Sequence, residues 1–148
     1  MNILEHPTMP NPRRIVLDTN CLLASLSRHG EYYPVWESFR TEKYTLCVSN
    51  SILEEYEEII GQKTSPVVAK NVIALLLKSR NVELIHPYFN FYLIEADHDD
   101  DKFVDCAFAA NAAYIVSEDK HFNILEQVTF PKIFVLRLRE FMEILEKE

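Results

Sequence analysis

Short runs of apolar residues alternate with longer segments of helical periodicity along this chain. Apolar residues at helical spacing, such as Ile52, Tyr56 and Ile60, predict helices over residues 21–29, 32–40, 52–60, 66–78, 100–113, 120–128 and from 137 onward. The short runs between them predict strands over residues 13–17, 44–48, 81–85, 114–116 and 132–136. This alternation is typical of an α/β domain with a doubly wound, Rossmann-like parallel sheet of about five strands.

Two segments do not fit this alternation. Residues 1–12 have no apolar core of signal-peptide length, and we expect a flexible N-terminal arm there. Residues 88–97 are rich in aromatic side chains, and a short extra strand over 91–94 is one interpretation of them. The chain has 148 residues, of which 48% are hydrophobic, which is enough to build one domain over residues 13–148.

Composition indicates the compartment and the kinds of partner that we expect for this protein. The three cysteines, Cys21, Cys47 and Cys106, are widely spaced and lie among apolar residues, which favours buried thiols in a reducing compartment. No run approaches the roughly 18 apolar residues of a membrane span. We therefore expect a cytoplasmic protein without membrane contact. The net charge of −8 argues against a broad basic surface for nucleic acid, unless clustered acids bind divalent cations that reverse the local field.

The predicted helix that begins near Asp100 carries acidic residues in its first two turns. Asp101 and Asp105 are four positions apart, so they share one helix face, and that face continues as Phe108. A face that becomes apolar one turn later packs on a sheet, which puts both carboxylates at the rim of the core. Asp99 and Asp100 fit a capping role at the positive end of the helix, and capping is also the alternative for the other two acids.

Acidic residues also follow two of the predicted strands. Asp18 comes directly after the first strand, and Asp119 comes shortly after the fourth. The carboxyl ends of parallel strands meet at one edge of the sheet, where ligands of α/β proteins bind. We therefore expect these two acids to converge with Asp101, Asp105 and a Glu of the third helix. The alternative for Asp18 is that it or Thr19 caps the helix that follows.

The candidate chemistry follows from what such a cluster can bind. Four or five carboxylates in one cleft must be protonated or neutralised by cations, and oxygen ligands favour Mg²⁺ or Mn²⁺. One or two such ions bind a phosphodiester oxygen and lower the pKa of a bound water, which is the chemistry of phosphodiester hydrolysis. Because glycine occurs only at Gly30 and Gly61, the chain has no dinucleotide-binding or Walker-type phosphate loop. It also has no serine elbow or Cys-His pair typical of a nucleophilic hydrolase.

Three motifs, taken in sequence order, resemble the PIN domain family. They are RIVLDTN at residues 14–20, SNSILEEYEEII at 49–60 and DDDKFVDCAFAANAAYIVSEDKHF at 99–122. The resemblance covers residues 13–145 and is to the bacterial subgroup of toxins from toxin-antitoxin pairs, which is related to VapC-type ribonucleases. It implies a single PIN-like domain with the doubly wound sheet described above, and metal-dependent ribonuclease activity.

The resemblance also implies a set of catalytic, metal-binding acids. Asp18 matches the first residue of the family's D-T-N motif, and Glu55 matches its helix acid, with Glu54 open as the alternative. The acids from two branches of the family are both present after residue 100. The implied set is Asp18, Glu55, Asp101, Asp105 and Asp119. Candidates for positioning the substrate around these acids are Asn20, Ser117 and Lys102.

The same resemblance implies partners. The substrate would be single-stranded RNA, which metal-activated water cuts to leave a 5′-phosphate and a 3′-hydroxyl. Members of the family commonly form homodimers, and toxins of this type are silenced by a small antitoxin protein whose tail occupies the acidic cleft. The alternative is a non-catalytic PIN-like module that binds a basic partner protein through the same acidic pocket.

Overall fold

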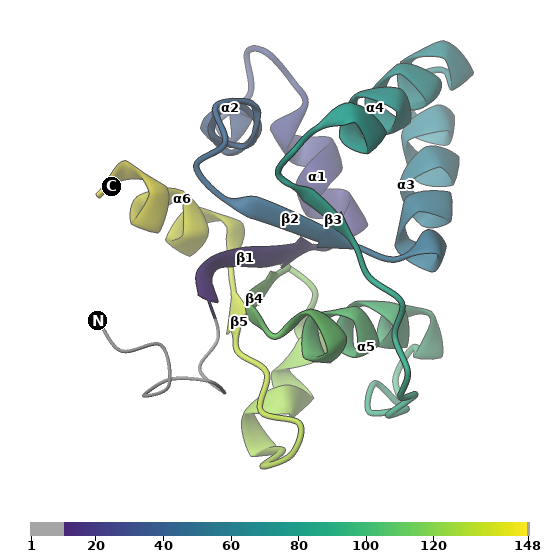
Figure 1. Cartoon of the computed structure of the whole chain (residues 1–148), viewed down its shortest axis with the longest axis vertical. Helices are drawn as coiled ribbons and strands as arrows, with labels where there is room; N and C mark the ends of the chain where they lie inside the picture. Colours follow the sequence, from purple (N-terminus) through teal and green to yellow (C-terminus); the bar gives the residue numbers. More distant parts are fainter. Residues whose placement is uncertain (1–10, 148) are drawn as a thin grey trace.

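A sheet of five parallel strands, in the order β3-β2-β1-β4-β5, forms the centre of the protein (Figure 1). The computed structural model describes residues 11–147, with side chains from residue 13 onward. Its strands are β1 (Asn11–Leu17), β2 (Thr45–Val48), β3 (Val82–Leu84), β4 (Ala112–Val116) and β5 (Val135–Leu136). The predicted doubly wound α/β fold is therefore confirmed. The predicted arm lies outside the described residues, except that the backbone of residues 11 and 12 begins β1.

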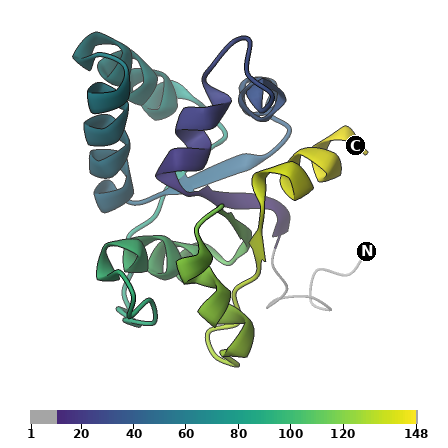
Figure 2. The ribbon, with the colours of Figure 1, turned by 180° about the vertical axis from the view of Figure 1, so that it is seen from behind.

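Helices cover both faces of this sheet, as Figures 1 and 2 show from opposite sides. One face carries α1 (Thr19–Ser25), α2 (Tyr33–Arg40), α3 (Asn50–Lys63) and α4 (Pro66–Lys78). The other carries α5 (Asp101–Ala110) beside the 3₁₀ segment η3 (Lys120–Gln127), and α6 (Leu138–Glu146) closes the chain. The chain adds β2 and β3 on one side of β1, and then adds β4 and β5 on the other side. Because crossovers between parallel strands are right-handed, the helices of these two halves lie on opposite faces of the sheet. Within residues 11–147, none of these helices is long and apolar enough to cross a membrane.

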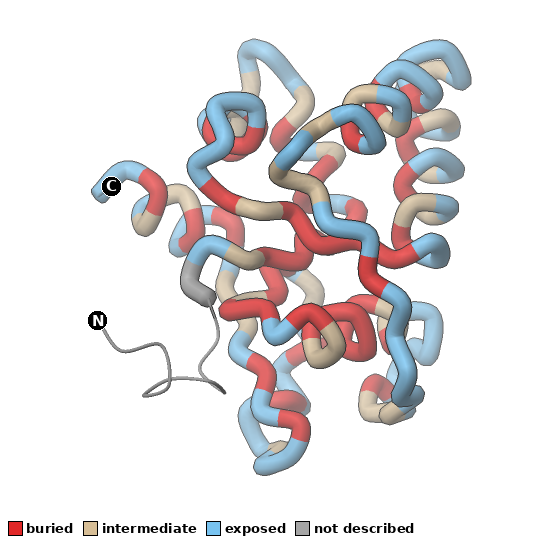
Figure 3. Tube along the Cα trace, viewed as in Figure 1, coloured by how far each residue is buried: buried red, intermediate tan, exposed pale blue. Residues whose placement is uncertain are grey.

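The core is continuous through the sheet because β1 lies at its centre. Ile15, Val16 and Leu17 are at most 1% exposed, and β1 pairs with both β2 and β4. A strand covered on both faces reads as an uninterrupted apolar run, which explains why the sequence pattern revealed it. Most of α5 is buried as well (Figure 3). The residues that follow β1 and β4 are consequently positioned by the most rigidly packed part of the protein.

Several elements have other bounds than the sequence predicts: α1 ends at Ser25, α3 continues to Lys63, and β5 covers only Val135–Leu136. Three further differences lie in or beside α5. The helix predicted over 100–113 ends at Ala110, because Asn111 adopts a left-handed conformation with φ 50° that terminates it. Residues 120–127 form a 3₁₀ helix in place of the predicted α-helix. Residues 91–94 form no strand, and two of their backbone amides donate to carboxylates of α5. The last difference bears directly on the site.

Candidate active site

Asp18 lies at the carboxyl end of β1. This is the topological switch point of the sheet, because β2 and β3 lie on one side of β1, and β4 and β5 lie on the other. Its backbone amide donates to the carbonyl of Val116 at 3.0 Å, and its carboxylate accepts a hydrogen bond from the hydroxyl of Ser117 at 2.7 Å. The side chain makes no capping bond to α1, so the capping alternative does not account for it. Burial raises the pKa of Asp18; the Ser117 hydroxyl opposes this rise, and the charges of Glu55 and Asp119 add to it.

Glu55 reaches the same edge of the sheet from α3. It accepts a hydrogen bond from the hydroxyl of Thr19 and lies 2.6 Å from the ammonium of Lys102. Tyr56, the next residue, is fully buried, and its hydroxyl donates to the last carbonyl of β1 at 2.6 Å. This bond fixes the rotation of α3, so that Glu55 faces the end of β1 while the side chain of Glu54 is exposed.

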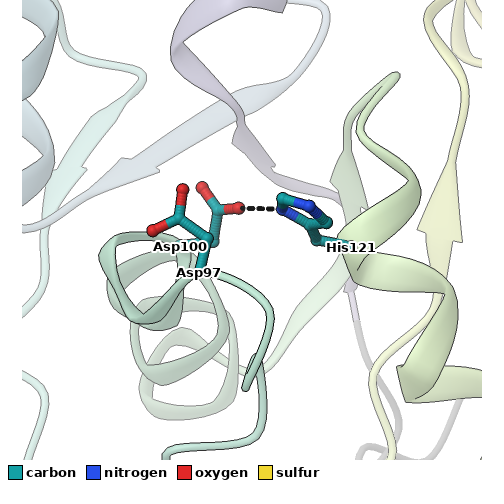
Figure 4. Close-up of side chains that lie close together, drawn as sticks. All are labelled: Asp97, Asp100 and His121. Atoms are coloured by element: carbon teal, nitrogen blue, oxygen red, sulfur yellow. Dashed lines mark hydrogen bonds and ion pairs between the residues drawn. The ribbon is translucent and has the colours of Figure 1, made fainter.

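Further acids come from the start of α5 and from the segment after β4. Asp97, Asp100 and His121 each offer a ligand atom, and these atoms lie within 4.8 Å of one another (Figure 4). The Nδ1 atom of His121 is 3.3 Å from a carboxylate oxygen of Asp100 and 3.3 Å from one of Asp119. Burial raises the pKa of Asp100 to about 6; the His121 contact opposes the rise, and the charges of Asp119, Asp18 and Asp97 increase it. Asp100 therefore belongs electrostatically to the cluster around Asp18.

The sequence predicts a capping role for Asp100, and the structure gives it a different one. Asp100 occupies the N-cap position of α5 but makes no side-chain capping bond. A 3₁₀ turn, η2 (His98–Asp100), precedes the helix and directs the Asp100 carboxylate toward His121. The sequence has a run of three aspartates at 99–101. Helical periodicity does not predict which of them faces the cluster, because a 3₁₀ turn changes to an α-helix at this point.

Asp101 and Asp105, which the sequence predicts as members of the same cluster, have other partners in the structure. The carboxylate of Asp101 accepts the backbone amide of Ile94 at 2.9 Å and lies 2.7 Å from Nδ1 of His98. That of Asp105 accepts the backbone amide of Phe91 at 3.1 Å. Burial raises the pKa of Asp105, the Phe91 amide lowers it, and the charge of Asp101 raises it. Both acids thus hold the 91–94 segment against α5.

The three residues considered for substrate positioning occupy distinct environments. Ser117 is buried and donates to Asp18, while its oxygen accepts the backbone amide of Asp119 at 3.0 Å. Lys102 pairs with Glu55 and lies at the edge of the acidic cluster. Asn20 is exposed at the start of α1. Ser117 therefore orders two acids at once, whereas Lys102 neutralises part of their charge.

The chemistry of the donor set fits a divalent cation. Four carboxylates, from Asp18, Glu55, Asp100 and Asp119, come from different parts of the chain near the switch point of the parallel sheet, where Glu55 and Asp119 act electrostatically on Asp18, and Asp119 and Asp18 act on Asp100. The imidazole of His121 adds a nitrogen donor at the rim. Buried carboxylates with facing charges raise one another's pKa unless a cation neutralises them. A hard cation with oxygen ligands satisfies this arrangement.

An acidic cluster at this position defines a candidate metal site of an α/β domain. This chain belongs to the PIN domain family, because a family model described as a PIN domain matches residues 14–121. PIN domains are typically nucleases that use divalent metal ions. A search among curated proteins found no match.

Two solved structures are similar in fold. One is a chain in the crystal structure of VapBC2 from Rickettsia felis bound to a DNA fragment from their promoter, with a TM-score of 0.57 and 17% identity over 84% of this chain and 98% of that one. The other is a chain in the crystal structure of DNA-bound VapBC from Salmonella typhimurium, with a TM-score of 0.55 and 16% identity over the same shares of the two chains. At these identities the similarity concerns the fold.

Proposed function

We propose that this chain is a metal-dependent endoribonuclease that hydrolyses single-stranded RNA and acts as the toxin of a toxin-antitoxin pair. The observation that carries the proposal is the environment of Asp18. Asp18 is 7% exposed, and its carboxylate faces the charges of Glu55 and Asp119, with the Ser117 hydroxyl as its hydrogen-bonding side-chain partner. Such an arrangement is costly without a cation, and PIN domains typically bind one.

The acids that would hold one or two Mg²⁺ or Mn²⁺ ions are Asp18, Glu55, Asp100 and Asp119. A bound ion supplies Lewis-acid chemistry, since it lowers the pKa of a coordinated water and neutralises charge on the phosphodiester. In the reaction, the water oxygen bonds to phosphorus, the bond from phosphorus to the 3′ oxygen breaks, and that oxygen takes up a proton. The products are a 5′-phosphate and a 3′-hydroxyl.

The protein's own residues orient this chemistry. Ser117 fixes the carboxylate of Asp18 and the backbone of Asp119, so the two acids keep one relative position. Lys102 balances the charge of Glu55 and presents an ammonium beside the cluster, where it can meet a substrate phosphate. We assign Asp101 and Asp105 to positioning the 91–94 segment, because backbone amides occupy their carboxylates.

Two further features of the proposal follow from the family. The structures similar in fold are of VapBC complexes, which supports a small antitoxin as the partner that covers the acidic cluster. We also propose that the active form is a homodimer, as is common among PIN proteins. Both features concern assembly, and they leave the assignment of the acids unchanged.

The test combines metal binding with cleavage. Mn²⁺ is titrated by calorimetry into the wild type and into Asp18→Asn, and a fluorescent single-stranded RNA is incubated with each protein at the same metal concentrations. We expect the wild type to bind Mn²⁺ and to cleave, and the variant to lose both. Absence of Mn²⁺ binding by the wild type would contradict the metal site. Metal binding without cleavage of any RNA or DNA would instead support a non-catalytic module that binds a basic protein.

A further inference from the structure

A cleft lies beside the acidic cluster, on the other side of the start of α5. It has a volume of about 440 Å³, within the range of roughly 300–1,000 Å³ typical of small-ligand sites. Asp100 faces His121 on one side of this helix start, and Asp101 lines the cleft on the other. Lys102 borders both, since it lines the cleft and pairs with Glu55. A ligand in the cleft would therefore lie next to the proposed metal site.

Tyr92 is the most unusual residue of this cleft. Tyr92 is 65% exposed, and its backbone has φ 52°, a conformation that non-glycine residues rarely adopt. The ring lies 5.9 Å from that of His98 in an edge-on arrangement at 82°. Positive φ strains the backbone of a bulky residue, and such strain is common at functional sites.

The backbone on both sides of Tyr92 is anchored. The amide of Phe91, which precedes it, donates to Asp105, and the amide of Ile94 donates to Asp101. The exposed ring is thus held on a fixed piece of backbone, which removes much of the entropy cost of using it in binding. This gives Asn90 and Tyr92, two residues of the otherwise unassigned aromatic segment 88–97, a defined role in shaping the cleft.

The remaining lining residues match the edge of a nucleobase. Asn50, Ser51 and Asn90 offer amide and hydroxyl groups that can both donate and accept hydrogen bonds. His86 and His98 add flat rings, and the flat face of an aromatic ring accepts any base by stacking. Stacking also suits a chain with a net charge of −8, because it does not depend on a basic surface.

We propose that this cleft binds a nucleobase of the single-stranded RNA substrate, with Tyr92 as the stacking platform. The base belongs to a nucleotide next to the phosphodiester at the acidic cluster, and Lys102 lies between the two positions. The inference rests on the proposed nuclease function for the identity of its ligand. It adds a substrate subsite lined by His86, Asn90, Tyr92 and His98 together with the start of α3.

Binding is measured apart from cleavage by fluorescence anisotropy of a labelled single-stranded RNA on the full chain, in EDTA and in Ca²⁺. Tyr92→Ala should weaken binding about tenfold, the effect of losing one base–aromatic stack. Tyr92→Gly should do the same, and because glycine adopts positive φ without strain it removes the ring without a backbone cost. Tyr88→Ala is the matched control, since Tyr88 is 68% exposed but lies outside the cleft.

Tyr92→Trp gives a direct readout of stacking. It keeps an aromatic platform, so RNA binding should stay within a few-fold of the wild type, and its fluorescence should be quenched when RNA binds. The native Trp36 is 9% exposed and provides the constant background. An RNA with abasic positions should neither quench this fluorescence nor bind as tightly as the intact strand.

The outcomes separate this inference from the nuclease proposal. Cleavage by Tyr92→Ala with the KM and kcat of Tyr88→Ala would overturn the subsite and leave the nuclease standing. Binding that depends on Tyr92, in a wild type that cleaves nothing, would support the subsite and overturn the nuclease. Equal binding of intact and abasic RNA, or no binding of any strand by the wild type, would overturn the subsite.

Discussion

Two groups of carboxylates lie on opposite sides of the start of α5, and they differ in what they face. Asp100 and Asp18 face other acids, and burial raises the pKa of both. Asp101 and Asp105 accept the backbone amides of the 91–94 segment, although burial and the charge of Asp101 raise the pKa of Asp105 as well. An amide donor stabilises the charged form of an acid locally, whereas a facing carboxylate destabilises it. Identical residue types at adjacent positions therefore have different partners, and on this difference we base the proposal that one group binds metal and the other supports the 91–94 segment.

The largest expected effect separates Asp100 from its neighbours. Asp100→Asn removes a charge from the proposed metal site, and we expect kcat/KM on single-stranded RNA to fall about 100-fold or more. Asp99→Asn is the control, because the Asp99 side chain is 80% exposed and should leave kcat/KM near the wild-type value. Full activity in Asp100→Asn together with loss of activity in Asp101→Asn would reverse the assignment of the two groups.

Divalent metal should stabilise the folded protein through the first group only. At a Mn²⁺ concentration about 100 times the dissociation constant, binding adds about 2.7 kcal/mol to the free energy of unfolding. We expect a corresponding rise in the Tm of the wild type and of Asp101→Ala, and no rise in Asp18→Asn. Thermal melting with and without Mn²⁺ measures the difference. A Tm rise that persists in Asp18→Asn would place the ion elsewhere.

The second group should matter for stability and not for metal affinity. Asp101→Ala leaves the buried amide of Ile94 without its acceptor, which costs about 1–3 kcal/mol of unfolding free energy. Urea denaturation checks this loss, with Asp99→Ala as the control that should lie within about 0.5 kcal/mol of the wild type. Loss of Mn²⁺ affinity with unchanged stability would make Asp101 a ligand instead.

The smallest expected effect is a pH dependence of the metal-free protein. The pKa of Asp100 is about 6 in the folded protein against an ordinary value of 3.8, so between these values the folded state binds more protons than the unfolded state. The free energy of unfolding should therefore fall as the pH rises through this window. Asp100→Asn should flatten this part of the curve. Denaturation in EDTA at several pH values tests it, and a slope unchanged by the substitution would contradict the assignment.

The sequence predicted the parts of the fold and site that depend on burial and on strand ends. β1 was recognised because both its faces are covered, and Asp18 and Asp119 follow from the rule that parallel strands present their carboxyl ends at one edge. Helical periodicity does not distinguish Asp100, which we propose for the metal site, from Asp101, because a 3₁₀ turn precedes α5 there. The role of residues 91–94 depends on long-range bonds to α5, which no local pattern encodes.

The hydrogen bond from the Tyr56 hydroxyl to the last carbonyl of β1 limits how the acidic cluster could be grafted onto another protein. Four acids grafted onto another parallel sheet would lack this hydrogen bond, which fixes the rotation of α3 about its axis. One residue inserted between Glu55 and Tyr56 would turn the Glu55 side chain by about 100° around the helix axis, away from the end of β1. Any such graft must therefore include β1 together with the first two turns of α3.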